Sequence, residues 1–245
     1  MADLKFKLTN EDILQILEKL YNDCIKGIDY VSPSIQELAD DYLNKTYDVK
    51  SAAKSFIKYQ IGKCTISGVI TGFGGLITLP ISIPANIGSV LYIQMRMIAC
   101  LAYMGGYDTK SDQVQTLVYA CLAGVSLENI IKKAGIEVGQ KIGHELVKKI
   151  PGSVIAKINQ KVGFRLVSRT STKGIITINK AVPVIGSVIS GGLDFTETKI
   201  IADRAYKMFI LGDFSDSDIK SDDNTIDIND FDIVDEDTNN PDTED

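Results

Sequence analysis

CTISGVITGFGGLITLPISIPANIGSVLYIQM, residues 64–95, is an uncharged stretch bounded by Lys63 and Arg96. At 32 residues it is longer than a membrane-spanning helix requires. Two prolines interrupt it, so a single straight helix is not expected. We predict a helical hairpin over residues 64–104 that turns at residues 79–84. The glycines and prolines that mark this hairpin are Gly68, Gly72, Gly75, Pro80 and Pro84.

A second apolar segment, residues 174–195, resembles the first in the placement of its proline and glycine residues. Pro183 precedes a Gly-Ser-Val triplet that begins at Gly186, as Pro84 precedes one that begins at Gly88, with the spacing differing by one residue. We therefore predict a second hairpin. Half-length helices suit shallow insertion into a bilayer, or burial against other helices, better than spanning, because backbone polar groups in lipid must be satisfied. Spanning stays open as an alternative.

Helical periodicity surrounds these hairpins. Residues 10–26 carry apolar side chains at helical spacing, between a cap at Thr9 or Asn10 and a stop at Gly27. Ser34 stands three residues before Glu37, which predicts a capping box for a helix running to about residue 44, and Asp48 can cap a third helix. Further helices are expected at 112–123, 126–150 and 184–209. The fold class predicted is an all-α helical bundle with glycine-rich apolar hairpins.

The secondary structure of residues 164–179, FRLVSRTSTKGIITIN, is not fixed by the sequence pattern alone. Their β-branched side chains surround a polar, glycine-containing turn, which favours a small β-hairpin. Tertiary context can make the same residues helical, so both structures are kept for this segment.

The charge distribution divides the chain in two. Residues 213–245 hold 14 of the 32 acidic residues and only Lys220 among the 26 basic ones, so residues 1–212 carry a net charge of +7 although the whole chain carries -6. This composition predicts a helical domain over 1–212 and a disordered acidic tail over 213–245. The tail also contains isoleucine, valine and phenylalanine among its aspartates. One hypothesis is that it docks on the basic body and competes with lipid; a solubilising role is the alternative.

The stretch from Lys132 to Lys180 is strongly basic, with 11 basic residues against Glu137 and Glu145. Near an anionic membrane each basic group adds on the order of 1 kcal/mol of attraction. RNA is the rival partner, but Phe164 is the only aromatic side chain in this stretch that could stack on a base. Lipid is therefore the preferred partner of this stretch, and the alternative is a solvent-exposed face that binds no partner. The candidate lipid contacts are Lys132, Lys133, Lys141, Lys148, Lys149, Lys157, Lys161, Arg165 and Arg169.

Four polar residues border the apolar segments: Gln94, Arg96, Asp108 and Asp194. An unpaired buried charge is costly, so these groups are expected either to pair within the bundle or to lie at a helix cap or at the level of lipid headgroups. The cap or headgroup position is favoured over a catalytic or transport role.

The sequence offers little for catalysis or metal binding. Its four cysteines are widely separated in apolar stretches, which indicates reduced, buried thiols in a cytosolic compartment. His144 is the only histidine, and a surface position is expected for it. No catalytic residue, metal ligand or cofactor is assigned. The charged, amphipathic N-terminus lacks the features of a secretory signal.

Several motifs resemble the EcsC family. They include the glycine-rich run from Gly68 to Pro80, Tyr92-Ile-Gln94-Met-Arg96, Gly106-Tyr-Asp108, Val162-Gly-Phe-Arg165-Leu and the segment from Pro183 to Asp194, within a resemblance covering residues 30–211. The family takes its name from a bacterial protein encoded beside an ABC transporter. The resemblance implies a membrane context and brings no established catalytic residues.

These observations predict a non-catalytic, membrane-associated helical protein on the cytoplasmic face. It would lie peripherally or shallowly inserted at the inner face of the cell membrane and act as an accessory to membrane machinery such as a transporter. The expected partners are anionic lipid and a membrane protein, without nucleic acid. The alternatives are a soluble helical protein that binds a lipid-like ligand and, less favoured, an enzyme.

Overall fold

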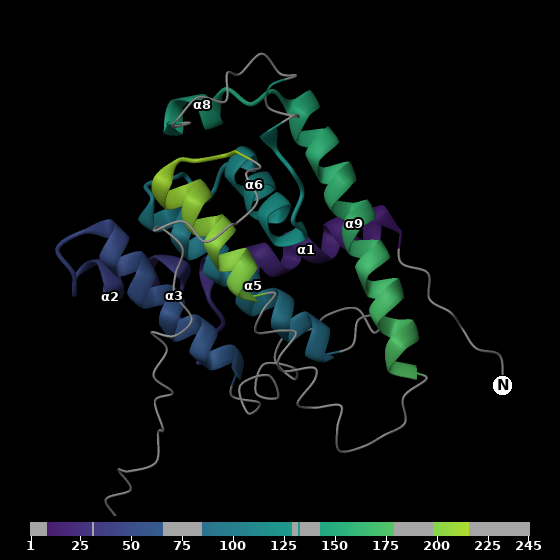
Figure 1. Ribbon diagram of the computed structural model, residues 1–245, viewed down its shortest axis with the longest axis horizontal. Coiled ribbons are helices and arrows are strands. Elements are labelled where there is room, and N and C mark those ends of the chain that lie inside the picture. The colour runs from purple at the N-terminus through teal and green to yellow at the C-terminus, as the bar shows by residue number, and fades with distance from the viewer. Residues whose placement is uncertain are drawn as a thin grey trace, which may run out of the picture.

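The computed structural model describes residues 9–30, 32–65, 85–128, 132, 143–178 and 198–215; for 63–65, 85–89 and 167–178 it describes the backbone only. These residues form a bundle of helices around one central helix, α5 (Figure 1). No strand occurs among them, apart from a single β-bridge between Ile28 and Ser32. The predicted all-α class is confirmed.

The first three helices begin where the sequence placed their caps. Helix α1, Asn10–Lys26, has a capping box between Thr9 and Asp12 and ends at Gly27, whose φ is 81°. Helix α2, Ile35–Leu43, has the predicted box between Ser34 and Glu37. Helix α3, Val49–Thr65, follows Asp48, whose Oδ1 accepts a hydrogen bond of 2.9 Å from the Ser51 amide. The local signals of this region therefore fix its helix starts.

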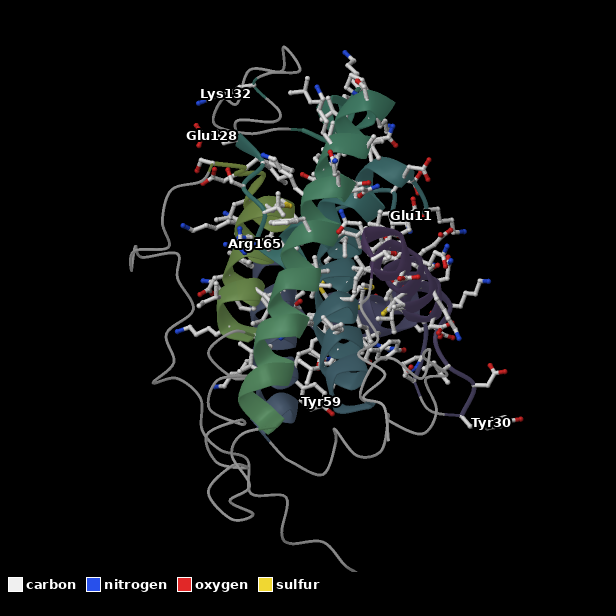
Figure 2. The ribbon with its side chains drawn as sticks, turned by 90° about the vertical axis from the view of Figure 1, so that its right-hand side faces the viewer. Glu11, Tyr30, Tyr59, Glu128, Lys132 and Arg165 are labelled. Carbon is white, nitrogen blue, oxygen red and sulfur yellow. The ribbon has the colours of Figure 1, made fainter. Side chains whose placement is uncertain are left out.

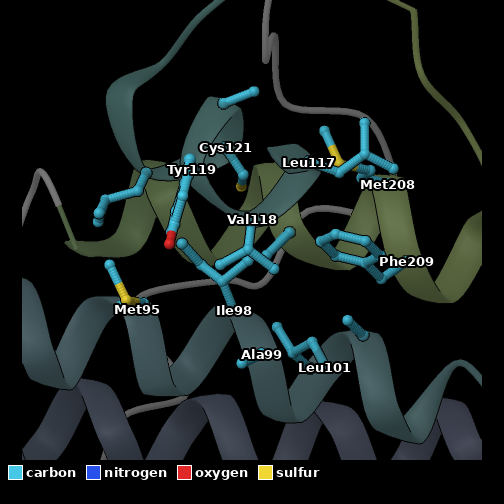
Figure 3. Packing of buried hydrophobic residues seen from close by; sticks show 14 of the residues in the cluster. Met95, Ile98, Ala99, Leu101, Leu117, Val118, Tyr119, Cys121, Met208 and Phe209 are labelled. Atoms are coloured by element: carbon cyan, nitrogen blue, oxygen red, sulfur yellow. The ribbon is translucent and has the colours of Figure 1, made fainter. Parts of the chain in front are cut away.

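Helix α5, Ala85–Met104, is the centre of the bundle and starts directly after Pro84. It contacts α1, α2, α3, α6 (Asp112–Ala123) and η1, a π-helix at Tyr206–Leu211. Figure 3 shows Met95, Ile98 and Leu101 of α5 packed with side chains of α6 and η1. Residues 92–102 are all buried. Of the settings kept open for the hairpin 64–104, burial against other helices therefore holds for residues 92–102 of α5.

The predicted helix at 112–123 is confirmed as α6, but a single helix over 126–150 is not found. Gly143 is extended, with φ -71° and ψ 164°, and caps a separate short helix, α8, His144–Lys148. Because a residue at these angles cannot continue a helical turn, the helical pattern breaks at this position.

Helix α9, Gly152–Ile178, replaces the β-hairpin considered for 164–179, and the hairpin interpretation is wrong for 164–178. The buried side chains Ile158, Val162 and Leu166 recur every fourth residue and line the face of α9 that packs on α1 and α6. This apolar stripe requires a helix, and its packing overrides the β propensity of the threonines and isoleucines that follow.

Residues 198–205 are helical and lead into η1, in agreement with the helix predicted over 184–209 as far as it is described. This segment packs on α5: Nε2 of Gln94 donates a buried hydrogen bond of 3.0 Å to Thr198 Oγ1. At the far end of α5, a Cβ on Gly105 would lie 2.1 Å from the Phe209 carbonyl oxygen. The two backbones therefore approach each other at a point that admits only glycine.

Candidate functional site

The candidate site is the exposed face of α9, which carries three basic side chains and one aromatic ring. Lys157, Lys161, Phe164 and Arg165 are exposed and stand at helical spacing, at positions i, i+4, i+7 and i+8. The Phe164 side chain is 69% exposed. Figure 2 looks onto α9 across this face, between α1 and the segment 198–211, and Arg165 projects toward the latter.

The lysines of this face differ from other predicted lipid contacts in their ion pairs. Lys132 pairs with Glu128, and Lys148 pairs with Glu145 at 2.8 Å. No acidic side chain among the described residues pairs with Lys157 or Lys161. The charges of Lys157 and Lys161 are therefore less neutralised than those of Lys132 and Lys148.

An open cleft of about 630 Å³ adjoins the same face of α9. Its walls come from the start of α1, the turn after α6 and the middle of α9: Asn10, Val125, Ser126, Gln160, Lys161, Phe164 and Arg165. Gly163 brings Asn10 to this wall, since a Cβ on this glycine would lie only 3.3 Å from Asn10 Cβ. The cleft thus combines cationic, hydrogen-bonding and apolar side chains.

A further arginine, Arg204, lies next to the cleft and was missed by sequence reasoning. Its Nη1 donates a hydrogen bond of 3.5 Å to the Cys121 carbonyl oxygen near the C-terminus of α6. Gly124 ends α6 with φ 67°, and a Cβ there would lie 2.9 Å from Arg204 Nη1 and 3.5 Å from Arg165 Nη2. Gly124 directly follows the predicted helix 112–123, but nothing in the sequence links it to either arginine.

The remaining predicted lipid contacts are dispersed. Lys149 is exposed just after α8, and the Arg169 backbone lies in α9 although its side chain is not described. Lys133 and Lys141 fall outside the described residues. The same is true of every hairpin marker and of one predicted polar group: Gly68, Gly72, Gly75, Pro80, Pro84, Pro183, Gly186 and Asp194. The hairpin predictions on those residues stay predictions.

Two of the polar residues predicted to border apolar segments are buried, and one is not. Gln94 bonds Thr198, and Arg96, 7% exposed, donates to Tyr92 Oη at 3.2 Å and to the Pro33 carbonyl oxygen at 2.5 Å. Arg96 is therefore neither a helix cap nor a headgroup-level charge, and that expectation is wrong. Asp108 is exposed in the loop before α6, where its Oδ1 accepts from the Lys110 amide at 3.0 Å.

The described thiols and the imidazole are held in structural roles. Cys24, Cys100 and Cys121 are free and buried. Burial raises the pKa of Cys100 and of Cys121 to about 12, so both stay protonated thiols at neutral pH. His144 is exposed, as predicted, and its Nε2 donates to the Gly105 carbonyl oxygen at 2.6 Å.

Two features are absent from the described part of the chain: a metal-ligand cluster and a membrane-spanning helix. Within those residues, no three histidine, cysteine or acidic side chains gather as metal ligands would. Nor does any helix there combine the length and the apolar character that crossing a bilayer requires.

Comparison with known proteins gives one family and one relative. The model of the EcsC protein family matches residues 6–211. "Uncharacterized protein YdbA" of Bacillus subtilis (strain 168) is 24% identical over 178 residues, which are 66% of this chain and 62% of that protein. The chain thus spans less than two thirds of the length of this relative. No solved structure matches the chain significantly.

Proposed function

The chain belongs to the EcsC protein family, and we propose that it is a non-catalytic helical protein that binds the anionic surface of a membrane from the cytoplasmic side. The observation that carries this proposal is the exposed α9 face, where Lys157, Lys161 and Arg165 surround Phe164. Cations beside an exposed aromatic ring suit the boundary between lipid headgroups and acyl chains.

The size of this face supports a reversible attachment. Three basic groups near an anionic surface contribute about 3 kcal/mol, and partial burial of one phenylalanine adds roughly 1–2 kcal/mol. The sum of about 4–5 kcal/mol corresponds to a dissociation constant of roughly 1 mM or somewhat below. Such an attachment weakens with salt, because the larger part of it is electrostatic.

The non-catalytic part of the proposal rests on the chemistry of the described side chains. The three buried cysteines are protonated, and the imidazole donates to a backbone carbonyl, so these groups are poor nucleophiles or bases as they stand. Free thiols also suit the reducing cytosol. An accessory role beside membrane machinery such as a transporter rests on the family resemblance. In that role the α9 face would hold the chain at the membrane while other surfaces contact a membrane protein.

A second candidate function is binding of a lipid-like ligand away from membranes. The cleft beside Phe164 favours it, because charged and apolar side chains share its walls. Flotation with vesicles separates the two candidates, since only the first requires the protein to bind a bilayer.

The test is flotation of the full chain with phosphatidylcholine vesicles, with and without phosphatidylserine, at low and high salt. The double variant Lys157→Glu/Lys161→Glu should abolish flotation with the anionic vesicles. The matched control is Lys50→Glu/Lys54→Glu, which has the same spacing and the same change in net charge but lies on the exposed face of α3. We expect the control to float nearly as well as the unaltered protein. Equal loss in both variants, or no flotation at all, would overturn the proposal.

A further inference from the structure

Two guanidinium groups from distant parts of the chain meet at the C-terminus of α6. Arg165 comes from α9 and Arg204 from the helical segment 198–205, and both approach the position that a Cβ of Gly124 would occupy. Because Gly124 has no side chain and adopts a left-handed φ of 67°, it leaves room for both groups.

The end of α6 contributes to the tolerance of two like charges here. The last carbonyl groups of a helix carry partial negative charge, which attracts cations. Arg204 donates to one of them, the Cys121 carbonyl oxygen, which also accepts a 3.1 Å bond from the Gly124 amide. The helix end therefore offsets part of the repulsion and fixes Arg204 beside Arg165.

The cleft places a third cation and several hydrogen-bonding groups next to this pair. Lys161 and Arg165 line it together with the polar side chains of Asn10, Ser126 and Gln160. Val125 and Phe164 add apolar surface on the same walls. Its volume of about 630 Å³ lies within the usual range for small-molecule sites.

We propose that this cleft binds a phosphate monoester group, with Lys161 and Arg165 contacting the phosphate and Phe164 packing on the carbon skeleton attached to it. A monoester carries up to two negative charges and three terminal oxygens, which suit a planar arginine fork and a nearby ammonium group. Arg204 adds positive potential from behind Gly124. This inference rests on the proposed membrane function for its lipid source, a headgroup such as that of phosphatidic acid, whereas a soluble phosphate ester offers the same chemistry.

The experiment compares full-chain flotation on two vesicle preparations adjusted to equal surface potential, one containing phosphatidic acid and the other phosphatidylserine. Calorimetry with glycerol 3-phosphate, and with glycerol as the blank, tests the soluble source. The key variant is Arg165→Lys, which keeps the charge but removes the two-pronged hydrogen bonding. Lys54→Arg is the control, since Lys54 is exposed on α3 and lines neither the cleft nor the α9 face.

We expect about tenfold stronger binding to the phosphatidic acid vesicles, lost in Arg165→Lys and kept in Lys54→Arg. Phosphatidylserine binding should be unchanged in Lys54→Arg, and in Arg165→Lys it should fall far less than phosphatidic acid binding, because the charge at residue 165 is kept. Binding of glycerol 3-phosphate without a vesicle preference, weakened by Arg165→Lys, would support the cleft and assign it to a soluble ester. Equal flotation on both vesicles together with no heat from glycerol 3-phosphate overturns the cleft and leaves the membrane function standing. Absence of flotation on both vesicles overturns the membrane function, and calorimetry then decides the cleft alone.

Discussion

The guanidinium of Arg96 donates a 2.5 Å hydrogen bond to the carbonyl oxygen of Pro33, which joins the central helix α5 to the turn before α2. Its other terminal nitrogen donates to Tyr92 Oη, and that hydroxyl lies 2.9 Å from Ser32 Oγ. Arg96 is buried, and both of these hydrogen bonds go to neutral oxygen atoms. The side chain therefore fixes residues 32–34, just before α2, onto the core.

Replacing Arg96 with leucine should lower the free energy of unfolding by about 2–3 kcal/mol, because the Pro33 carbonyl and the Tyr92 hydroxyl both lose a charged hydrogen-bond donor. Urea denaturation followed by circular dichroism measures this change. Arg96→Lys should have a stability between those of the unaltered protein and Arg96→Leu, since the single nitrogen of lysine does not match the two separate donor nitrogens of the guanidinium. Folded Arg96→Leu protein should still float with anionic vesicles; a selective loss of flotation at unchanged stability would place Arg96 at the membrane after all.

Gly105→Ala should destabilise the protein strongly. The new Cβ would stand 2.1 Å from the Phe209 carbonyl oxygen, so the backbone of α5 or η1 must move. We expect a loss of about 3 kcal/mol or more in the free energy of unfolding. The control is Gly62→Ala within α3, where nothing lies within 4 Å of the new Cβ. There alanine should stabilise the helix by roughly 0.5–1 kcal/mol. A similar small effect at both glycines would contradict the close approach.

Local signals in the sequence were enough to predict the starts of the first three helices, but not the helical structure of residues 164–178. Thr9, Ser34 and Asp48 cap their helices through atoms only a few residues away, so the sequence reveals these helix starts. The segment 164–178 has β-branched side chains, yet it continues helix α9, whose buried residues Ile158, Val162 and Leu166 pack in the bundle with α1 and α6, and no local pattern contains that packing.

The candidate site also could be predicted only in part from the sequence. The basic stretch pointed to Lys157, Lys161 and Arg165, because charge is visible in composition. The convergence of Arg204 and Arg165 over Gly124 joins residues about 40 and 80 positions apart. Only the fold reveals it.

The stability of the protein should fall at alkaline pH. Burial raises the pKa of Cys100 and Cys121 from an ordinary 9.0 to about 12. A group whose pKa is raised on folding contributes fully below its unfolded pKa and loses that contribution as pH rises toward its folded pKa. The loss therefore runs from about pH 9 to pH 12, with a slope of about 1.4 kcal/mol per pH unit for each thiol. Urea denaturation at pH 7, 9 and 10.5 measures it. The Cys100→Ala/Cys121→Ala variant should show a shallower dependence, and an identical one would contradict the assignment to these thiols.

Deleting residues 216–245 should strengthen flotation with anionic vesicles at low salt. The region from residue 213 onward holds 14 acidic residues, whereas residues 1–212 carry a net charge of +7. Removing the acidic segment abolishes its repulsion from the membrane and any competition for the basic face. The control is the full-length chain with every aspartate from residue 216 onward replaced by asparagine. It should behave like the truncation, while weaker flotation of the truncated chain would contradict the electrostatic account.

The most direct test of the central claim is an environment-sensitive fluorophore on the α9 face. Gln160→Cys provides its attachment point in a Cys64→Ser background, since Cys24, Cys100 and Cys121 are buried. Lys45→Cys provides the control in the loop between α2 and α3, on the opposite side of the bundle from α9 (Figure 1). With phosphatidylserine vesicles, emission at residue 160 should shift to shorter wavelength and return in high salt, while residue 45 stays unchanged. An unshifted spectrum at residue 160, or equal shifts at both positions, would contradict membrane binding through this face.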